Sequence, residues 1–398
     1  MIISTSIKMG PKTLCNCERE PQKSRKSDQR QFSRIEYLLK HGKCQPMLNE
    51  EDEVDTISYL EHTQENTNVD DTNVNFEAAK EFFRRNFFSI FVCMLTGLYT
   101  LMFIPSISRL LFYTKKSDNP IKAFSRYLDT LNHTIQWYMS PKERTKSLKT
   151  VRKLHTMALK QTLRKIEDED CVVTDQGAVP MSQFDLVLTQ WAFIGAALIR
   201  SKDIGLRDVT QAELRYLTNQ MYQVGRELGI ANKFNLCSGN LEDIIEYAKD
   251  IESFVIRPAL ESEKEFESMS KHLMKGVNVL NPFIDPDAFS TWTHKLFGAK
   301  RSYQRRVENL RSYKSRVLYF LLIFLFKYVL NIKPIRWFAV FPLNTLMDLN
   351  IYMANILRQQ ITKDYYPNHL PLPLHLWIYG ILSYVKFQFL EMFQGLIK

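Results

Sequence analysis

The stretch SQFDLVLTQWAFIGAALIR, residues 182–200, decides the fold class of this chain. Its large apolar side chains are distributed nearly all the way around a helix, and they are Phe184, Leu186, Val187, Leu188, Trp191, Phe193, Ile194 and Leu198. A helix without a polar face is buried at the centre of a large protein or surrounded by lipid. Ser182 and Asp185 have the spacing of a capping box, with Asp in place of the usual Glu or Gln. We therefore expect a central helix that begins just after Ser182.

Helical patterns continue on both sides of this central stretch. On its N-terminal side, Asn119-Pro120 opens a helix that runs to about Tyr138, and Ser140-Pro141 separates it from a second helix. Three more helical stretches follow on its C-terminal side, at 210–229, 240–259 and 282–297. The chain has only 13 glycines in 398 residues and shows no regular alternation of apolar and polar residues, which would indicate strands. These patterns predict an all-α fold with a multi-helix core.

The N-terminal part, residues 1–75, is polar, basic in its first half and acidic in its second. This composition predicts a disordered tail, with a local helix at about 33–41. No apolar run follows Met1, so we expect no signal peptide. The six cysteines have the spacing of neither a zinc knuckle nor a disulfide framework, which favours a reducing compartment.

Residues 76–115 form a hydrophobic segment that contains NFFSIFVCMLTGLYTLMFIPSIS, residues 86–108, without a single charge. A membrane-spanning helix needs roughly 20 apolar residues, and this run is long enough. Asn86, Gly97 and Pro105 interrupt its apolar character. Two interpretations stay open: a membrane-associated helix, spanning or monotopic, and a buried core helix of a large helical protein.

The last part of the chain, residues 301–398, is rich in aromatic residues. VLYFLLIFLF, residues 317–326, is too short to span a membrane alone. The stretches 336–349 and 371–397 fit amphipathic interfacial helices, a hydrophobic lid or ordinary core helices. The net charge of the chain is +10, and basic pairs such as Lys115-Lys116 flank apolar runs. This pattern suits an anionic membrane surface, and the absence of any nucleic-acid motif argues against a nucleic-acid partner.

One histidine lies on the apolar face of a predicted helix. In SLKTVRKLHTMALK, residues 147–160, His155 shares a helical face with Leu148, Val151 and Leu159. In the preceding helix Arg126 and Thr130 lie one turn apart, and the short connection should bring both helices side by side. Arg126, Thr130 and His155 are therefore candidates for one pocket. The alternative is that His155 is an ordinary core residue and that the polar face with Arg126 and Thr130 is exposed to solvent.

Most other site chemistries lack their motifs in this sequence. There is no HExxH or paired CxxC for zinc, no GxSxG for a hydrolase, and no GxGxxG or GxxxxGK[ST] loop for a nucleotide. A haem needs less, namely one axial ligand, an apolar slot and one or two cations for its propionates. His155 as the iron ligand, with Arg126 beside it, is compatible with that requirement.

The stretch from about Phe82 to about Glu246 resembles the MpaB/rubber-oxygenase catalytic-domain family. Four motifs carry the resemblance, and they are Arg126-x-x-x-Thr130, Val151-Arg152-x-x-His155, Asp185 with Trp191, and Gly225-x-x-x-Gly229. The resemblance implies a helical catalytic domain over 116–300 with a globin-like core and haem b. It also implies an oxygenase that cleaves double bonds of an apolar, isoprenoid-type substrate with dioxygen. Membrane association follows from it too, at the endoplasmic reticulum or another intracellular membrane.

The resemblance also implies roles for individual residues. His155 would ligate the haem iron, Arg126 would bind a propionate or polarise bound oxygen, and Thr130 would orient this network. A polyprenyl chain drawn from membrane lipid is the expected kind of substrate. The oligomeric state is left open.

Two positions depart from the family pattern. Phe193 stands where the family often has histidine, and Asp129 stands where latex-clearing members place lysine. Two alternatives to the oxygenase therefore remain. One is a non-catalytic, membrane-associated helical protein on the same fold, and the other is a haem or lipid carrier.

Overall fold

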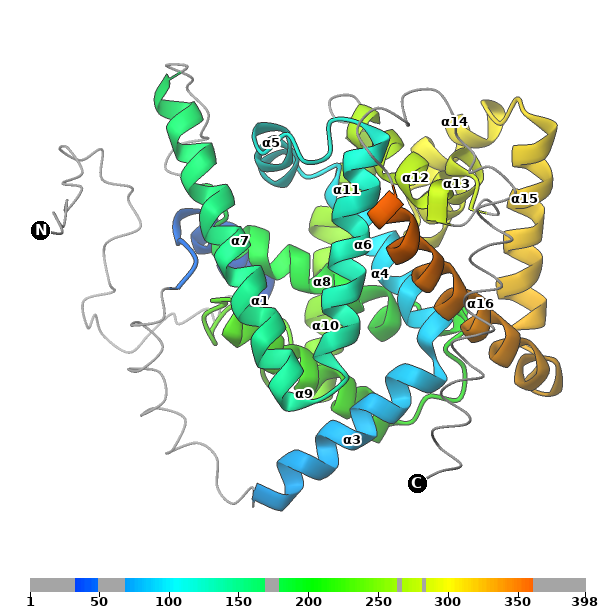
Figure 1. The fold of residues 1–398 in the computed structure, drawn as a ribbon, viewed down its shortest axis with the longest axis horizontal. Coiled ribbons are helices and arrows are strands. Elements are labelled where there is room, and N and C mark those ends of the chain that lie inside the picture. The colour runs from blue at the N-terminus through cyan, green and yellow to red at the C-terminus, as the bar shows by residue number, and fades with distance from the viewer. Residues whose placement is uncertain (1–32, 49–68, 169–178, 263–266, 281–283, 361–398) are drawn as a thin grey trace, which may run out of the picture.

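The computed structural model describes residues 33–48, 69–168, 179–262, 267–280 and 284–360, and its elements are helices throughout (Figure 1). No strand is present in these described ranges. The predicted all-α, multi-helix fold is therefore confirmed.

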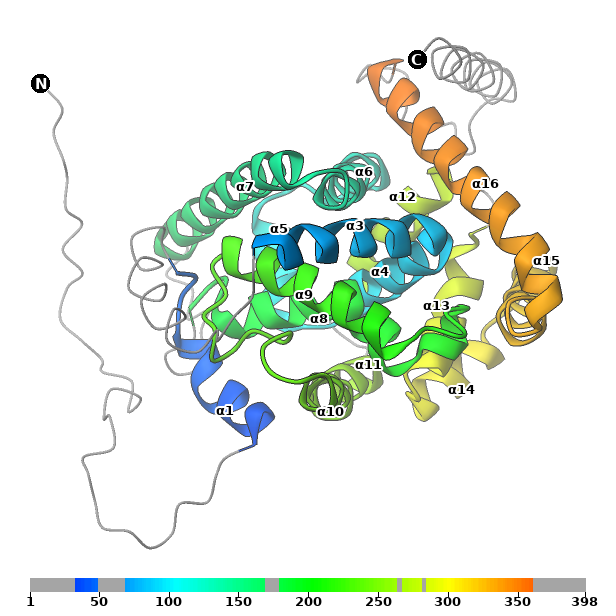
Figure 2. The ribbon, with the colours of Figure 1, turned by 90° about the horizontal axis from the view of Figure 1, so that it is seen from below.

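Two helices form the centre of the molecule, α4 (Phe87–Leu101) and α8 (Gln183–Ile199). In α8 every residue except Thr189 and Ile199 is buried, as its apolar composition predicts. Ser182 accepts a hydrogen bond from the Asp185 amide, and the Asp185 carboxylate accepts one from the Ser182 amide at 3.0 Å. The predicted capping box and the central position of this helix are both confirmed (Figure 2).

α4 and α8 approach each other closely because Gly97 has no side chain. A Cβ atom at Gly97 would lie 1.9 Å from the Ala192 carbonyl oxygen. Four residues earlier in α4, the Cys93 Sγ donates a hydrogen bond to the Phe193 carbonyl oxygen at 3.3 Å. The backbones of the two helices are thus in direct contact at their crossing.

Replacing Gly97 with alanine is expected to lower the free energy of unfolding by about 2 kcal/mol. Overpacking a core costs ~1–3 kcal/mol, and a contact with rigid backbone belongs at the upper end of that range. The better helix propensity of alanine offsets up to ~1 kcal/mol. Urea denaturation of parent and variant measures the difference, and a rise in the midpoint would show that helix propensity outweighs the crossing.

The other helices surround this central pair. They are α3 (Val69–Arg85), α5 (Pro105–Tyr113), α6 (Pro120–Trp137), α7 (Pro141–Asp168), α9 (Gln211–Glu227), α10 (Leu241–Ile251), α11 (Arg257–Ser262), α12 (Glu267–Leu280), α13 (Pro286–Leu296), α14 (Lys300–Glu308), α15 (Tyr313–Phe324) and α16 (Lys333–Gln360). Three short helical segments link some of them. They are the 3-10 helix η3 (Ser201–Ile204) and the π-helical segments η4 (Glu252–Ile256) and η5 (Leu325–Val329). Asn119, Thr210, Asn240 and Asp285 cap four of the helices with their side chains.

The uncharged run 86–108 is divided between two helices. α4 ends at Leu101, Pro105 opens α5, and the two helix axes differ by 89°. Nearly all side chains of α4 are buried in the protein core. Within the described ranges no single helix is long and apolar enough to cross a membrane, and only the bent pair α4–α5 meets that test by length and composition. The packing therefore favours the core-helix interpretation of this run.

The local helix expected at about 33–41 is confirmed, whereas the disordered tail expected over 1–75 is wrong for residues 33–48. This segment contains α1 (Arg34–His41) and η1 (Gly42–Cys44), and Leu38 within it is fully buried. Arg34 donates hydrogen bonds to the carbonyl oxygens of Asn235 at 2.6 Å and Ser238 at 3.0 Å. These contacts bridge about 200 positions of sequence, which a composition argument does not detect. α3 also begins at Val69, before the predicted boundary at 76.

The C-terminal helices belong to the same core as the rest. One hydrophobic cluster of buried residues extends from Ile35 to Ile351, so the predicted segments 76–115, 116–300 and 301–398 are not separated by independent cores. On α15, Tyr319 hydrogen-bonds with Tyr303 at 2.9 Å. The predicted apolar stretch 371–397 lies outside the described residues.

Candidate functional site

α6 and α7 form an antiparallel pair, as their short connection predicts. His133 Nδ1 of α6 lies 2.9 Å from the Ser147 hydroxyl of α7. A second contact follows further along the pair: Arg126, seven residues before His133 in α6, interacts electrostatically with His155, eight residues after Ser147 in α7. The polar face of α6 therefore points toward α7 rather than into solvent. The seam between the two helices brings Arg126 and His155 together.

The His155 imidazole has a buried nitrogen without a hydrogen-bond partner among the described residues, and its pKa is lowered. This nitrogen is Nδ1. Burial, followed by the charge of Arg126, lowers the pKa of His155 to about 4. A buried polar atom without a partner costs ~1–3 kcal/mol, so it calls for an explanation. One explanation is a bound group that this imidazole serves as ligand or donor.

Arg126 is half-buried and has no carboxylate partner among the described residues. Its Nη1 donates a long hydrogen bond to the Ser117 hydroxyl at 3.5 Å. Burial lowers the pKa of the Arg126 guanidinium, and no carboxylate of the described residues forms an ion pair with it. A desolvated guanidinium in this state favours an anionic ligand.

Thr130 lies between Arg126 and His133 on the same helix face, but its hydroxyl is bonded within α6. Thr130 Oγ1 donates to the backbone carbonyl of Arg126 at 3.1 Å. The predicted role of Thr130 in orienting the Arg126 guanidinium is therefore not present as a direct contact. Thr130 thus lies at the seam without a hydrogen bond to the side chain of Arg126 or His155.

Asp129, which stands where latex-clearing proteins have lysine, pairs with an arginine outside the α6–α7 seam. Arg358 of α16 bonds both carboxylate oxygens of Asp129, one of them at 3.1 Å. This ion pair joins α6 to α16 rather than to α7. Asp129 therefore has a structural partner.

The remaining motif residues are structural. Trp191 is fully buried, and its Nε1 donates to the Ala248 carbonyl oxygen at 3.0 Å, which confirms the core role expected for it. Arg152 donates to the carbonyl oxygens of Glu227 at 2.9 Å and Leu48 at 2.6 Å, fastening the end of the 33–48 segment. Gly229 has a φ of +87°, the left-handed conformation that favours glycine at a helix end.

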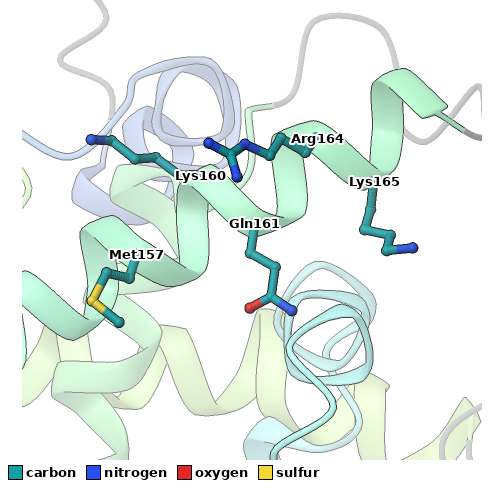
Figure 3. A pocket seen from close by; sticks show the side chains of 5 residues that line it. All are labelled: Met157, Lys160, Gln161, Arg164 and Lys165. Atoms are coloured by element: carbon teal, nitrogen blue, oxygen red, sulfur yellow. The ribbon is translucent and has the colours of Figure 1, made fainter.

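Two hollows on the described part of the surface are lined by residues other than His155. A shallow hollow of about 470 Å³ lies along α7 and is lined by Met157, Lys160, Gln161, Arg164 and Lys165, whose side chains spread apart (Figure 3). A second hollow of about 360 Å³ is lined by Phe83, Arg84, Phe87, Ile135, Tyr138, Met139 and Asp348. Neither includes His155. Among the described residues no group of three or more His, Cys, Asp or Glu could hold a bare metal ion.

Sequence reasoning missed a second buried histidine, His294 of α13. Its Nδ1 lies 2.6 Å from the Ser302 hydroxyl and its Nε2 lies 3.2 Å from the Tyr99 hydroxyl. Tyr99 in turn hydrogen-bonds with Ser290 at 2.6 Å. Desolvation lowers the pKa of His294 to about 2. The only signal in the sequence is Ser290 one turn before His294. Because its ring nitrogens are both bonded, His294 is a structural residue.

The chain matches no protein-family model, no curated protein and no solved structure. The resemblance to the MpaB/rubber-oxygenase family thus rests on the four short motifs alone. Of their residues, the structure brings Arg126 and His155 together at one seam and uses Arg152, Asp185, Trp191 and Gly229 for packing and caps.

Proposed function

We propose that this protein is a haem-binding oxidoreductase that uses dioxygen on an apolar, isoprenoid-type substrate, and that His155 would hold the haem iron. The observation that carries the proposal is the pairing of a buried imidazole nitrogen that has no hydrogen-bond partner with a half-buried guanidinium that has no carboxylate partner, both among the described residues.

The donor set at the seam fits haem b. A neutral imidazole can ligate iron through one ring nitrogen while the other is held by a hydrogen bond, and His155 has a nitrogen without a partner. The Arg126 guanidinium is suited to a propionate carboxylate, which would supply the missing counter-charge. When bound, the haem would supply the redox-active iron that activates dioxygen.

The residues of the chain have separate tasks in this proposal. His155 would hold the group, since its low pKa leaves the imidazole unprotonated and able to ligate at neutral pH. Arg126 orients the group through charge. Thr130, bonded to its own helix, shapes the seam.

The two positions that depart from the family pattern favour a second candidate function. On this alternative the chain is a non-catalytic helical protein, and His155 and Arg126 bind no group. The replacement of the usual distal-side residues by Asp129 and Phe193 agrees with it, because Asp129 pairs with Arg358 and the Phe193 ring packs on Trp137 at 5.4 Å.

Protein purified from haem-supplemented cells is expected to show a Soret band that His155→Ala abolishes. Arg126→Gln is expected to weaken haem binding roughly tenfold or more, since it removes a charged hydrogen-bond donor. His133→Ala is the matched control, because it removes a neighbouring histidine of the same seam and should retain the band. Far-UV circular dichroism checks that each variant is folded.

Two results would contradict the proposal: a folded parent without haem, or an unchanged Soret band in His155→Ala. A haem-loaded protein that consumes no oxygen and forms no product with isoprenoid alkenes would be a carrier and not an oxygenase.

A further inference from the structure

An apolar surface at one end of the molecule is formed by α15, η5 and the first half of α16. We call it the α15–α16 face, and its exposed members are Tyr313, Val317, Phe320, Leu321, Phe324, Tyr328, Ile332, Ile335, Trp337, Phe338 and Phe341. Trp337, Phe338 and Phe341 are each more than 70% exposed. Figures 1 and 2 show α15 and the start of α16 together at the edge of the helical body. Contiguous exposed aromatic residues on this scale indicate a binding surface.

The exposed residues of α15 and η5 form a regular stripe. Tyr313, Val317, Phe320, Phe324 and Tyr328 are spaced four, three, four and four residues apart, which keeps them on one side of the helix. The opposite side is fixed to the core by buried residues, as in the stacking of Phe326 on Trp292 at 4.6 Å and the bond of Tyr319 to Tyr303. α15 is therefore apolar on both sides, unlike an ordinary surface helix.

The start of α16 is also held firmly in place. The Asn344 side chain donates to the Arg85 carbonyl oxygen at 3.0 Å and accepts from the Phe88 amide at 2.9 Å. Arg336 donates to Asp208 at 2.6 Å and to the Arg207 carbonyl oxygen at 2.7 Å. The α15–α16 face is thus preformed, and its aromatic side chains are presented on anchored helices.

The charge of this region has one sign. From Asn309 to Met347 the chain contains no aspartate or glutamate. The same stretch contains six cationic residues, which are Arg311, Lys314, Arg316, Lys327, Lys333 and Arg336. Lysines around Trp, Tyr and Phe are typical of the membrane interface, where the charged ends reach the lipid phosphates.

We propose that the α15–α16 face docks on the surface of an anionic lipid bilayer. Its aromatic side chains would lie at the boundary between headgroups and acyl chains, with α15 and α16 along the membrane and not across it. The flanking lysines would contact anionic headgroups. This inference is independent of haem binding.

The charge pattern disfavours the other occupants of such a face. A symmetric contact with a second copy would bring the same cationic stretch face to face with itself. Residues 361–398 of this chain contain only two acidic residues against three lysines, so they do not complement it. The core of a protein–protein interface is depleted in lysine, whereas a membrane interface is not.

The test is flotation of the full chain with vesicles of phosphatidylcholine and phosphatidylserine in a 4:1 ratio, beside phosphatidylcholine alone. The parent is expected to float with the mixed vesicles, and Trp337→Ser/Phe338→Ser/Phe341→Ser is expected to stay at the bottom. Phe112→Ser/Phe254→Ser is the matched control, because it removes two aromatic residues of 64% and 62% exposure elsewhere on the surface. This control should float like the parent.

A charge variant tests the second part of the proposal. Lys314→Gln/Lys327→Gln should weaken binding to the mixed vesicles about 25-fold, at roughly fivefold per cation near an anionic surface. Lys149→Gln/Lys153→Gln on α7 removes the same charge from exposed positions elsewhere and should have little effect.

A conservative variant guards against misfolding of the triple mutant. Lipids brominated near the headgroup should quench tryptophan fluorescence of the parent, and Trp337→Phe should lose most of that quenching while still floating. The proposal is overturned if parent and triple variant float equally, or if neither floats. A triple variant that changes only the melting temperature or the oligomeric mass would mean that protein covers the face.

Discussion

Replacing Trp191 with alanine is expected to lower the free energy of unfolding by about 4 kcal/mol. Truncation of a buried Trp or Phe to Ala typically costs ~3–5 kcal/mol, because a cavity remains where the ring was. Trp191 is fully buried in α8, its ring packs on Phe297 at 5.4 Å, and Gly195 leaves the space that its indole fills. Equilibrium unfolding in guanidinium chloride measures the difference.

Trp191→Phe separates the hydrogen bond from the packing. It keeps an aromatic ring but removes the indole donor to the Ala248 carbonyl oxygen, which still accepts from the Glu252 amide, so a cost of only ~0.5–1.5 kcal/mol is expected. Equal losses in the two variants would mean that the bond, and not the filled volume, dominates at this position. A loss below 1 kcal/mol in Trp191→Ala would contradict the central place assigned to α8.

Acidification from pH 6.5 to 4.5 is expected to destabilise the protein by several kcal/mol. Burial depresses the pKa of His155 to about 4 and that of His294 to about 2, against about 6.5 in the unfolded chain. The folded state thus binds fewer protons than the unfolded state in this window. The stability contributed by each neutral histidine is present above pH 6.5 and is lost as the pH falls toward its folded-state pKa.

For each proton that the unfolded state binds in excess of the folded state, the free energy of unfolding falls by ~1.4 kcal/mol per pH unit. Two histidines give a loss of about 5 kcal/mol over two pH units, reduced by groups of opposite sign. Asp185 is one of these, because burial raises the pKa of its carboxyl. Urea unfolding at several pH values gives the slope, and His155→Gln should reduce it by close to one proton. A slope that is flat between pH 6.5 and 4.5 would show that both imidazoles are solvated.

Much of the helical framework could be predicted from local signals. Asn119-Pro120 opens α6, Pro141 opens α7, and the pair Ser182 and Asp185 opens α8, each as the sequence indicates. Caps and prolines act within one turn, so a local pattern contains the whole cause. The seam between α6 and α7 was also predictable, because the short connection leaves few other arrangements.

Contacts between distant segments were not predictable in the same way. The docking of α1 depends on Arg34 reaching backbone carbonyls of Asn235 and Ser238, and carbonyl groups have no sequence signature. The break between α4 and α5 inside an uncharged run is a tertiary feature as well. His294 shows the same limit, since its partner Tyr99 belongs to another helix.

The candidate site was predicted in part. Arg126 and His155 are adjacent as the helical faces indicate, whereas the hydroxyl of Thr130 turned to its own backbone. The hydroxyl of any threonine within a helix can donate to the backbone carbonyl four residues earlier. The sequence alone does not show whether it does so or bonds another side chain.

The docking of residues 33–48 makes this segment comparable to a tethered peptide ligand. Arg34 lies over the Tyr247 ring at 4.1 Å, Leu38 fills the core, and the Leu48 amide bonds the Gly229 carbonyl oxygen at 3.0 Å. Its binding is governed by an effective concentration, which the chain between 48 and 69 sets. Cleavage of that connection would convert the fold into a complex of two pieces, whose stability would then depend on dilution.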